Sequence, residues 1–377
     1  MQRVSAMIHR GIRTGILFGG RSCEHEVSIQ SARGVLSAID RDKYELAPIG
    51  VTKDGEWVLI RNDQVQPGKP LSRDCGPKLN LLPDPTCAGL LRLEQTSVKT
   101  QEAVALDVIF PLIHGPMGED GTVQGLFELA GIPYVGSGVL ASAAGMDKVV
   151  MKALFGKAGL PVTPCRTFLR SRWESEHAAI LNECEAAFPY PWFIKPANMG
   201  SSVGVSKVHG RAEFQSAMDE AARYDRKLIV EAAVEDAREI EAAVLGNDHP
   251  KVSVPGEIIP CNEFYDYRAK YLDDASGLII PAELPDSVLK RIQSLSLAAY
   301  SALDCAGLAR VDFLLRRSDH AVFVSEINTL PGFTPISMYP KLWEASGISY
   351  TALISQLIEL AFERHAERRR NQTTYAA

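Results

Sequence analysis

Four polar side chains within residues 309–337 have the types and spacing of a site that binds a divalent cation and phosphate. This stretch predicts two strands joined by a polar turn, and residues two apart in a strand share a face. Arg310 pairs in this way with Asp312, and Glu326 with Asn328. Carboxylates and an amide suit Mg²⁺ better than Zn²⁺, and the arginine can hold phosphate or a developing oxyanion. The alternative is an amphipathic hairpin whose polar face is simply solvated.

Glu24 is an acid in a place that ordinarily favours anions. Residues 15–20, GILFGG, predict an apolar strand that runs into a glycine turn, and residues 27–39 have helical spacing. Because a helix start after such a turn attracts negative groups, a carboxylate there could receive an ammonium group. The alternative is that Glu24 only stabilises the dipole of the following helix. The G-x-G-x-x-G motif of dinucleotide-binding proteins is absent.

Two glycine-rich loops could hold a ligand through their backbone. The loop HGPMGEDG, residues 114–121, follows a predicted buried strand, and the loop KPANMGSSVGV, residues 195–205, follows a short one. N–H groups and hydroxyls of the second loop could wrap a phosphate. A Walker A motif is absent, and a glycine–serine loop by itself is most often only a turn.

The elements that must position these residues alternate between strand and helix in the first part of the chain, which predicts a parallel sheet. Ligands of such sheets bind at the carboxyl ends of the strands, where Glu24, His114 and Glu119 fall. Residues 62–101 are rich in Pro, Gly and Asp and are interpreted as a surface excursion. The rest of the hairpin at 309–337 is apolar and is formed by Val311, Phe313, Val322 and Val324.

Composition narrows the class of protein. A chain of 377 residues is expected to form two or three domains, and its net charge of −6 argues against a nucleic-acid partner. No apolar run approaches the ~20 residues of a membrane span, and no signal-peptide core is visible. Seven scattered cysteines without a C-x-x-C motif predict reduced thiols in the cytoplasm.

Taken together, eight short segments in order resemble the D-alanine–D-alanine ligases, which are ATP-grasp carboxylate–amine ligases. The segments are GGRSCEHEVS, HGPMGEDGTVQG, GSGVLASAAGMDK, KPANMGSSVGVSK, REIEAAVLG, EFYDYRAKY, ARVDF and EINTLPGFTPIS. The resemblance implies a parallel-sheet α/β domain over residues 1–145 and an α+β ATP-grasp fold of two subdomains. The central subdomain, 146–235, would carry the Gly–Ser lid, and the last, 236–377, the metal and substrate site.

The resemblance also implies roles for individual residues. Two Mg²⁺ ions, or Mn²⁺ in their place, would bridge the ATP phosphates and would be held by Asp312, Glu326 and Asn328. The residues that would bind the nucleotide are Lys148 and Lys195 at the phosphates, Ser202 in the lid, the hinge residues Glu231, Ala232, Ala233 and Val234, Glu239 at the ribose, and Lys270.

The implied catalytic set surrounds two D-alanines. Glu24 would hold the ammonium group of the first, and Ser337, together with Lys270, the carboxylate of the second. The lid residues Ser201 and Tyr271 would hydrogen-bond with Glu24, and Arg310 and the Gly332 N–H would form the oxyanion hole. His114 has two open interpretations, a loop histidine satisfied by the backbone or a direct role at the first substrate.

The expected activity is ATP-dependent ligation of two D-alanines through an acyl phosphate, for peptidoglycan precursors, by a cytoplasmic homodimer that acts on small molecules. The first alternative is a D-alanine–D-lactate ligase, a type that lacks the loop tyrosine kept here as Tyr271. Others are a different ATP-grasp carboxylate–amine ligase and a non-catalytic ATP-binding protein. No residue identifies a general base for the attacking amine or a monovalent-cation site.

Overall fold

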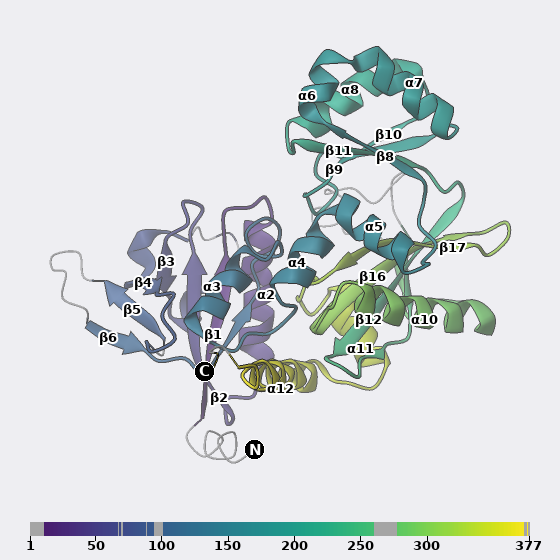
Figure 1. Ribbon diagram of the computed structural model, residues 1–377. Coiled ribbons are helices and arrows are strands. Elements are labelled where there is room, and N and C mark those ends of the chain that lie inside the picture. Colours follow the sequence, from purple (N-terminus) through teal and green to yellow (C-terminus); the bar gives the residue numbers. More distant parts are fainter. Residues whose placement is uncertain are drawn as a thin grey trace.

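Three β-sheets organise the protein (Figure 1). The computed structural model describes residues 11–372 and 375, except 67, 69–70, 88, 94–100 and 260–276. The first sheet belongs to the first part of the chain, and the second stands above the third at the other end of the molecule (Figure 1). None of the helices in the described ranges is long and apolar enough to cross a membrane.

The first sheet has a parallel centre and an antiparallel side, in the order β6-β5-β4-β3-β2-β1-β7. Strand β1 runs parallel to both β2 and β7, as the alternation of strand and helix predicts. The strands are β1 (Ile12–Gly19), β2 (Tyr44–Val51), β3 (Trp57–Leu59), β4 (Lys78–Leu81), β5 (Leu90–Leu93), β6 (Gln101–Val104) and β7 (Val108–Pro111). The helices of this part are α2 (His25–Ala38), α3 (Thr122–Ala130) and α4 (Val139–Met146).

The segment 62–101 differs from the surface excursion predicted for it. It contributes β4 and β5 to the first sheet, and Leu79 and Leu90 are almost fully buried in the core. Strand β4 alternates exposed and buried residues over only four positions. Such a short alternation between turn-forming residues carries too little periodicity to indicate a strand from sequence.

The second sheet is small and antiparallel, in the order β10-β9-β11-β8. Its strands are β8 (Cys165–Leu169), β9 (Trp192–Pro196), β10 (Ser206–Val208) and β11 (Lys227–Ala232). Helices α6 (Arg170–Ser175), α7 (His177–Ala187) and α8 (Arg211–Ala222) lie above it (Figure 1). Trp173, Trp192 and Phe214 belong to a hydrophobic core whose buried residues all come from this region. The loop after β9 carries the predicted Gly–Ser lid.

The third sheet contains the predicted hairpin and has the order β15-β14-β12-β16-β17, with β13 paired to β12. Its strands are β12 (Ala237–Gly246), β13 (Lys251–Val252), β14 (Gly256–Ile259), β15 (Gly277–Ile279), β16 (Gly307–Arg316) and β17 (Val322–Asn328). The helices that pack on it include α5 (Lys148–Lys157), α10 (Asp286–Ala302), α11 (Met338–Ala345) and α12 (Tyr350–Arg368).

A β-bulge at Ser325 decides which way the polar residues of the hairpin point. Asp312 pairs with Glu326, but the next residue of β16, Phe313, pairs with Val324. Strict alternation along β17 would put Glu326 on the buried face with Val324, whereas the extra residue returns it to the open face. The face shared by Glu326 and Asn328 is therefore as inferred from sequence, and the bulge, which the sequence did not reveal, allows Val322 and Val324 to be buried on the opposite face.

The contacts that join the first part of the chain to the third sheet include the packing of α12 and a close backbone approach at Gly307. The apolar face of α12, including Leu353 and Leu357, belongs to the same buried cluster as Ile16 and Phe110 of the first sheet. Close by, the backbone at Gly307 approaches Gly136, where a Cβ added to Gly307 would lie 3.1 Å from the Gly136 nitrogen. Gly307 has a φ of +74°, so it needs glycine for its conformation and for this approach.

We expect Gly307→Ala to destabilise the protein more than Gly159→Ala. Both glycines have positive φ, but nothing lies within 4 Å of a Cβ at Gly159. The strained conformation should therefore lower the free energy of unfolding by ~1–2 kcal/mol in both variants. The contact with Gly136 should add ~1–3 kcal/mol at Gly307 alone. Thermal melts of the two variants measure the difference, and equal melting temperatures would contradict the close approach.

Candidate active site

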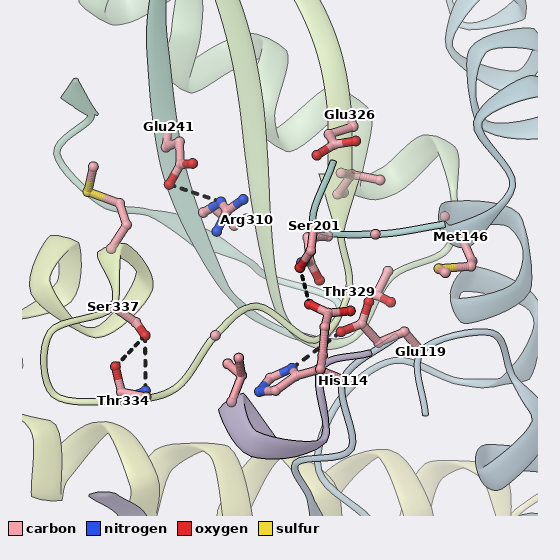
Figure 2. A pocket seen from close by; sticks show the side chains of 18 of the residues that line it. His114, Glu119, Met146, Ser201, Glu241, Arg310, Glu326, Thr329, Thr334 and Ser337 are labelled. Carbon is pink, nitrogen blue, oxygen red and sulfur yellow. Dashed lines mark hydrogen bonds and ion pairs between the residues drawn. The ribbon is translucent and has the colours of Figure 1, made fainter. Parts of the chain in front are cut away.

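Two adjoining cavities lie where the three sheets meet. The first, of about 240 Å³, is lined by the loops of the first part of the chain and by the third sheet (Figure 2). The second, of about 150 Å³, lies between the second and third sheets. They share the wall formed by Lys148, Met199, Gly200, Ser201, Glu241 and Glu326. The two cavities therefore adjoin at these residues, and ligands bound in them would lie next to each other.

Arg310 is a half-buried cation that lines the first cavity, with 16% of its side chain exposed. Its guanidinium makes two 2.7 Å hydrogen bonds to the carboxylate of Asp312 and lies 3.0 Å from Glu241 Oε2 (Figure 2). Burial lowers the pKa of Arg310, but the charges of Asp312 and Glu241 outweigh it and raise that pKa above its ordinary value. The side chain is thus a fixed positive charge facing the cavity.

The predicted metal ligands have suitable donors and placement for Mg²⁺. Asp312 and Glu326 are opposite each other on β16 and β17, and Asn328 is opposite Arg310. Among the described residues no group of three His, Cys, Asp or Glu side chains could hold a metal ion, so the predicted site would draw on the amide of Asn328 as well as on the two carboxylates. Two carboxylates and an amide fit a hard cation that keeps water among its ligands.

Glu24 is buried, with 8% of its surface exposed, and its carboxylate lies at the first cavity. It is the N-cap residue of α2 but makes no side-chain cap hydrogen bond. Instead it accepts a hydrogen bond from Ser201 of the lid loop. A Cβ at Gly115, whose φ is +78°, would lie 2.8 Å from Glu24 Oε2, so a side chain there would force the carboxylate to shift.

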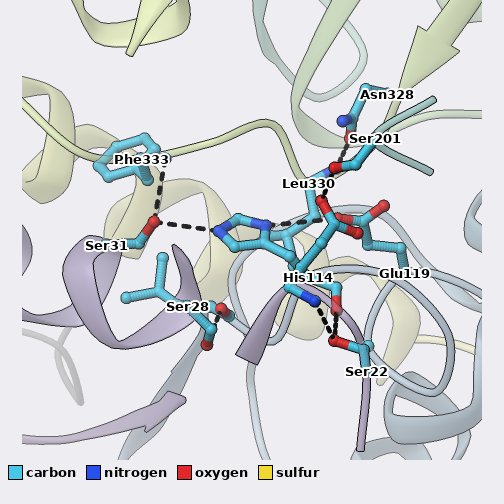
Figure 3. A network of polar contacts seen from close by, with 12 residues as sticks. Ser22, Ser28, Ser31, His114, Glu119, Ser201, Asn328, Leu330 and Phe333 are labelled. Atoms are coloured by element: carbon cyan, nitrogen blue, oxygen red, sulfur yellow. Dashed lines mark hydrogen bonds and ion pairs between the residues drawn. The ribbon is translucent and has the colours of Figure 1, made fainter. Parts of the chain in front are cut away.

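His114 is buried beside Glu24 in a network of side chains (Figure 3). Its Nδ1 lies 3.3 Å from Glu119 Oε1, and its Nε2 lies 3.0 Å from Ser31 Oγ. Burial lowers the pKa of His114, but the hydrogen bond and charge of Glu119 outweigh burial and raise it. Both interpretations left open by the sequence stay open, because the ring interacts with the Leu330 backbone as well as with the side chains of Glu119 and Ser31.

The loop after β17 closes the first cavity. Gly332 and Ser337 both line it, and a Cβ at Gly332 would come within 3.2 Å of Ser337 Oγ. Ser337 Oγ also accepts a 3.1 Å hydrogen bond from Thr334 N–H, which fixes the hydroxyl at the cavity edge (Figure 2). The predicted substrate residues Glu24, Arg310, Gly332 and Ser337 are thus brought to one cavity.

The predicted nucleotide residues are brought together only in part. The second cavity is lined by Lys148, Lys195, Ser202, Glu231, Ala232 and Glu239. Ala233 and Val234 line neither cavity, and Ala233 N–H donates to Pro191 O. Lys148 Nζ donates to Met199 O at 2.8 Å and lies 3.6 Å from Glu326. Lys270 and Tyr271 lie outside the residues that the structure describes.

Two charged residues of this region were not singled out from sequence. Glu241 lines both cavities and holds Arg310. Its position two residues after Glu239 in one strand was a usable signal, because the two share a face. Lys152 is buried against Glu231, and only the fold brings these two residues together.

Comparison with known proteins gives one consistent family. A family model described as D-ala D-ala ligase N-terminus matches residues 13–137, and one described as D-ala D-ala ligase C-terminus matches 154–359. The D-alanine–D-alanine ligase of Heliobacterium modesticaldum is 51% identical over 95% of this chain and 96% of its own. The D-alanine–D-alanine ligase of Natranaerobius thermophilus is 47% identical over 97% of this chain and 99% of its own.

Solved structures agree. The VanG D-Ala:D-Ser ligase of Enterococcus faecalis superposes with a TM-score of 0.82 at 35% identity, over 93% of this chain and 99% of that one. The D-alanine–D-alanine ligase of Coxiella burnetii has a TM-score of 0.79 at 36% identity, over 96% of both chains. The chain therefore belongs to the D-alanine–D-alanine ligase family.

Proposed function

We propose that this protein joins two D-alanines into D-alanyl-D-alanine, with conversion of ATP to ADP and phosphate, for peptidoglycan synthesis. The observation that carries the proposal is the meeting of two cavities at Glu326, with Arg310 and Glu24 in one and Lys195 in the other. Curated members of the family that match nearly the whole chain are named D-alanine–D-alanine ligases. The D-lactate alternative is not favoured.

The charges of the site suit an acyl phosphate mechanism. A free carboxylate is a poor electrophile because it is negatively charged and would have to expel an oxide ion, so the carboxylate of the first D-alanine must first receive the γ-phosphoryl group. That transfer needs cations to neutralise the spreading charge rather than a protein nucleophile. Lys148, Lys195 and Arg310 supply three. Two bound Mg²⁺ ions would supply further neutralisation at the phosphates, and Asp312, Glu326 and Asn328 are the residues that would hold them.

The first cavity would orient both amino acids. Glu24 would accept the ammonium group of the first D-alanine, and Ser337, with Lys270, would bind the carboxylate of the second. Attack of the second amine forms a tetrahedral oxyanion at the acyl carbon. We assign its stabilisation to Arg310 and the Gly332 N–H, groups that typically contribute ~3–4 kcal/mol each. Ser201, already bonded to Glu24, and Tyr271 would close the lid and keep water from the acyl phosphate.

The organisation of the chain follows the same proposal. We place the substrate domain within residues 1–145, the lid subdomain within 146–235 and the metal-binding subdomain within 236–377. Helix α5, at the start of the second part, packs Met151 and Phe155 into the core of the third sheet and so joins the two ATP-binding parts. A cytoplasmic homodimer is the working form that we propose.

An assay of ADP release tests the function directly. We expect the protein with ATP and Mg²⁺ to release ADP when D-alanine is added, and to form D-alanyl-D-alanine that mass spectrometry detects. D-lactate and D-serine, each added with D-alanine, test the acceptor. ADP release without any amino acid, or products that contain only D-lactate or D-serine as acceptor, would overturn the proposal.

Glu24→Gln should weaken binding of the first D-alanine and leave the stability of the fold nearly unchanged. The amide fills the same space but loses a charge-assisted bond worth ~1.5–3 kcal/mol. The Michaelis constant of the first D-alanine should therefore rise roughly ten- to a hundred-fold, while that of ATP changes little. Glu26→Gln is the control, because Glu26 is exposed in the same first turn of α2 and lines neither cavity. Equal kinetics of the two variants would reduce Glu24 to a helix-dipole role.

Glu326→Gln should impair the metal site. We expect kcat to fall roughly 100-fold or more, since even loss of groups that only support a metal ligand costs about 10–100-fold. The Mg²⁺ concentration for half-maximal activity should rise as well. Asp319→Asn, in the exposed turn of the same hairpin, should leave both quantities unchanged. Normal turnover of Glu326→Gln at limiting Mg²⁺ would show that Glu326 is not a ligand.

A further inference from the structure

Lys152 is a buried cation that the proposed mechanism does not use. It lies on α5, is 5% exposed and lines neither cavity. Its Nζ is 2.5 Å from Glu231 Oε1 and donates to Thr163 Oγ1 at 3.0 Å. The Thr163 hydroxyl in turn donates to Glu231 Oε1. These three groups form a closed set of contacts behind the second cavity.

The other oxygen of the same carboxylate faces the cavity. Glu231 Oε2 accepts a 2.7 Å hydrogen bond from Lys195 Nζ, and both Glu231 and Lys195 line the second cavity. Burial raises the pKa of Glu231, but the charges of Lys152 and Lys195 outweigh burial and lower it. One ionised carboxylate is therefore shared by two ammonium groups, and the cluster carries one net positive charge.

We propose that Lys152 is a positioning residue for the nucleotide, which neutralises Glu231 so that the charge of Lys195 remains available to the phosphates. The inference rests on the proposed ATP site. Without Lys152 the pair of Glu231 and Lys195 would be neutral. Lys195 would be held by a full counter-charge, and a phosphate would have to compete with that carboxylate for the ammonium group. The cavity would lose attraction for an anion although no group that touches the nucleotide had changed.

The competing explanation is that Lys152 only ties α5 to β11. A second ion pair joins the same two elements, between Asp147 at the start of α5 and Lys227 at the start of β11. Neither residue lines a cavity. Lys227→Met therefore removes a comparable tether and the same unit of positive charge at a position outside both cavities, and it serves as the matched control.

The test is calorimetric titration of the full-length protein with ADP and Mg²⁺ at fixed ionic strength. Lys152→Met should weaken ADP binding roughly tenfold or more, the effect of losing one charged interaction, with the Michaelis constant of D-alanine little changed. Lys152→Met combined with Glu231→Gln restores one net positive charge and should bind ADP more tightly than Lys152→Met, about as tightly as Glu231→Gln alone, which measures any direct contact of Glu231 with the nucleotide. Lys227→Met should bind ADP like the wild type, even with a lower melting temperature.

The double variant separates the two explanations. A tether would be weakened further by the second substitution, whereas charge balance is restored by it. Unchanged ADP affinity in Lys152→Met, or a double variant that binds ADP no more tightly than Lys152→Met although Glu231→Gln alone binds it, would overturn the inference while the wild-type protein still binds ADP. Failure of the wild type to bind ADP would overturn the proposed function and the inference together. Lys152→Gln has the same loss of charge and replaces Lys152→Met if that variant does not fold.

Discussion

Three carboxylates crowd one row of the third sheet, and the site depends on how their charge is balanced. Glu241, Asp312 and Glu326 occupy the same register position on three neighbouring strands. Like charges directly opposite each other on a sheet destabilise it, so this row can exist only beside cations. Arg310 balances two of the carboxylates from within the sheet, and Lys148 reaches the third from α5. Where the two cavities meet, the protein thus has a row of three carboxylates whose negative charge is only partly balanced by two cations.

The sequence could predict the elements and the chemistry of this row but not its assembly. The shared face of Arg310 and Asp312 in β16 could be predicted, because the alternation of side chains along a strand depends only on local backbone geometry. The Ser325 bulge was hidden, since an extra residue in one strand is defined only by its partner strand. Lys152 could not be found for a similar reason, because its partner Glu231 comes from a distant segment of the chain. Glu241 differs, since its spacing from Glu239 already placed it on the same face.

Helix α5 links these charges to the architecture. Its N-terminus is capped by Asp147, which accepts hydrogen bonds from Val149 N–H and Val150 N–H and also pairs with Lys227 of the second sheet. Its apolar side packs in the core of the third sheet. One short helix therefore sets the position of a cavity-lining lysine and the distance between the two sheets that enclose the second cavity. A displacement of α5 would change the shape of that cavity and its charge together.

The packing of α12 has a consequence for the order of synthesis. This helix comes late in the chain, yet its apolar face fills the same core as β1 and β7, which come early. Domains generally fold as units from the N-terminus while the ribosome is still adding residues. Helix α2 can cover part of this face of the first sheet early, but the part that α12 covers stays exposed until α12 emerges, so the nascent chain carries exposed apolar surface through most of its translation. Chaperones that hold nascent chains would be needed longest at this face.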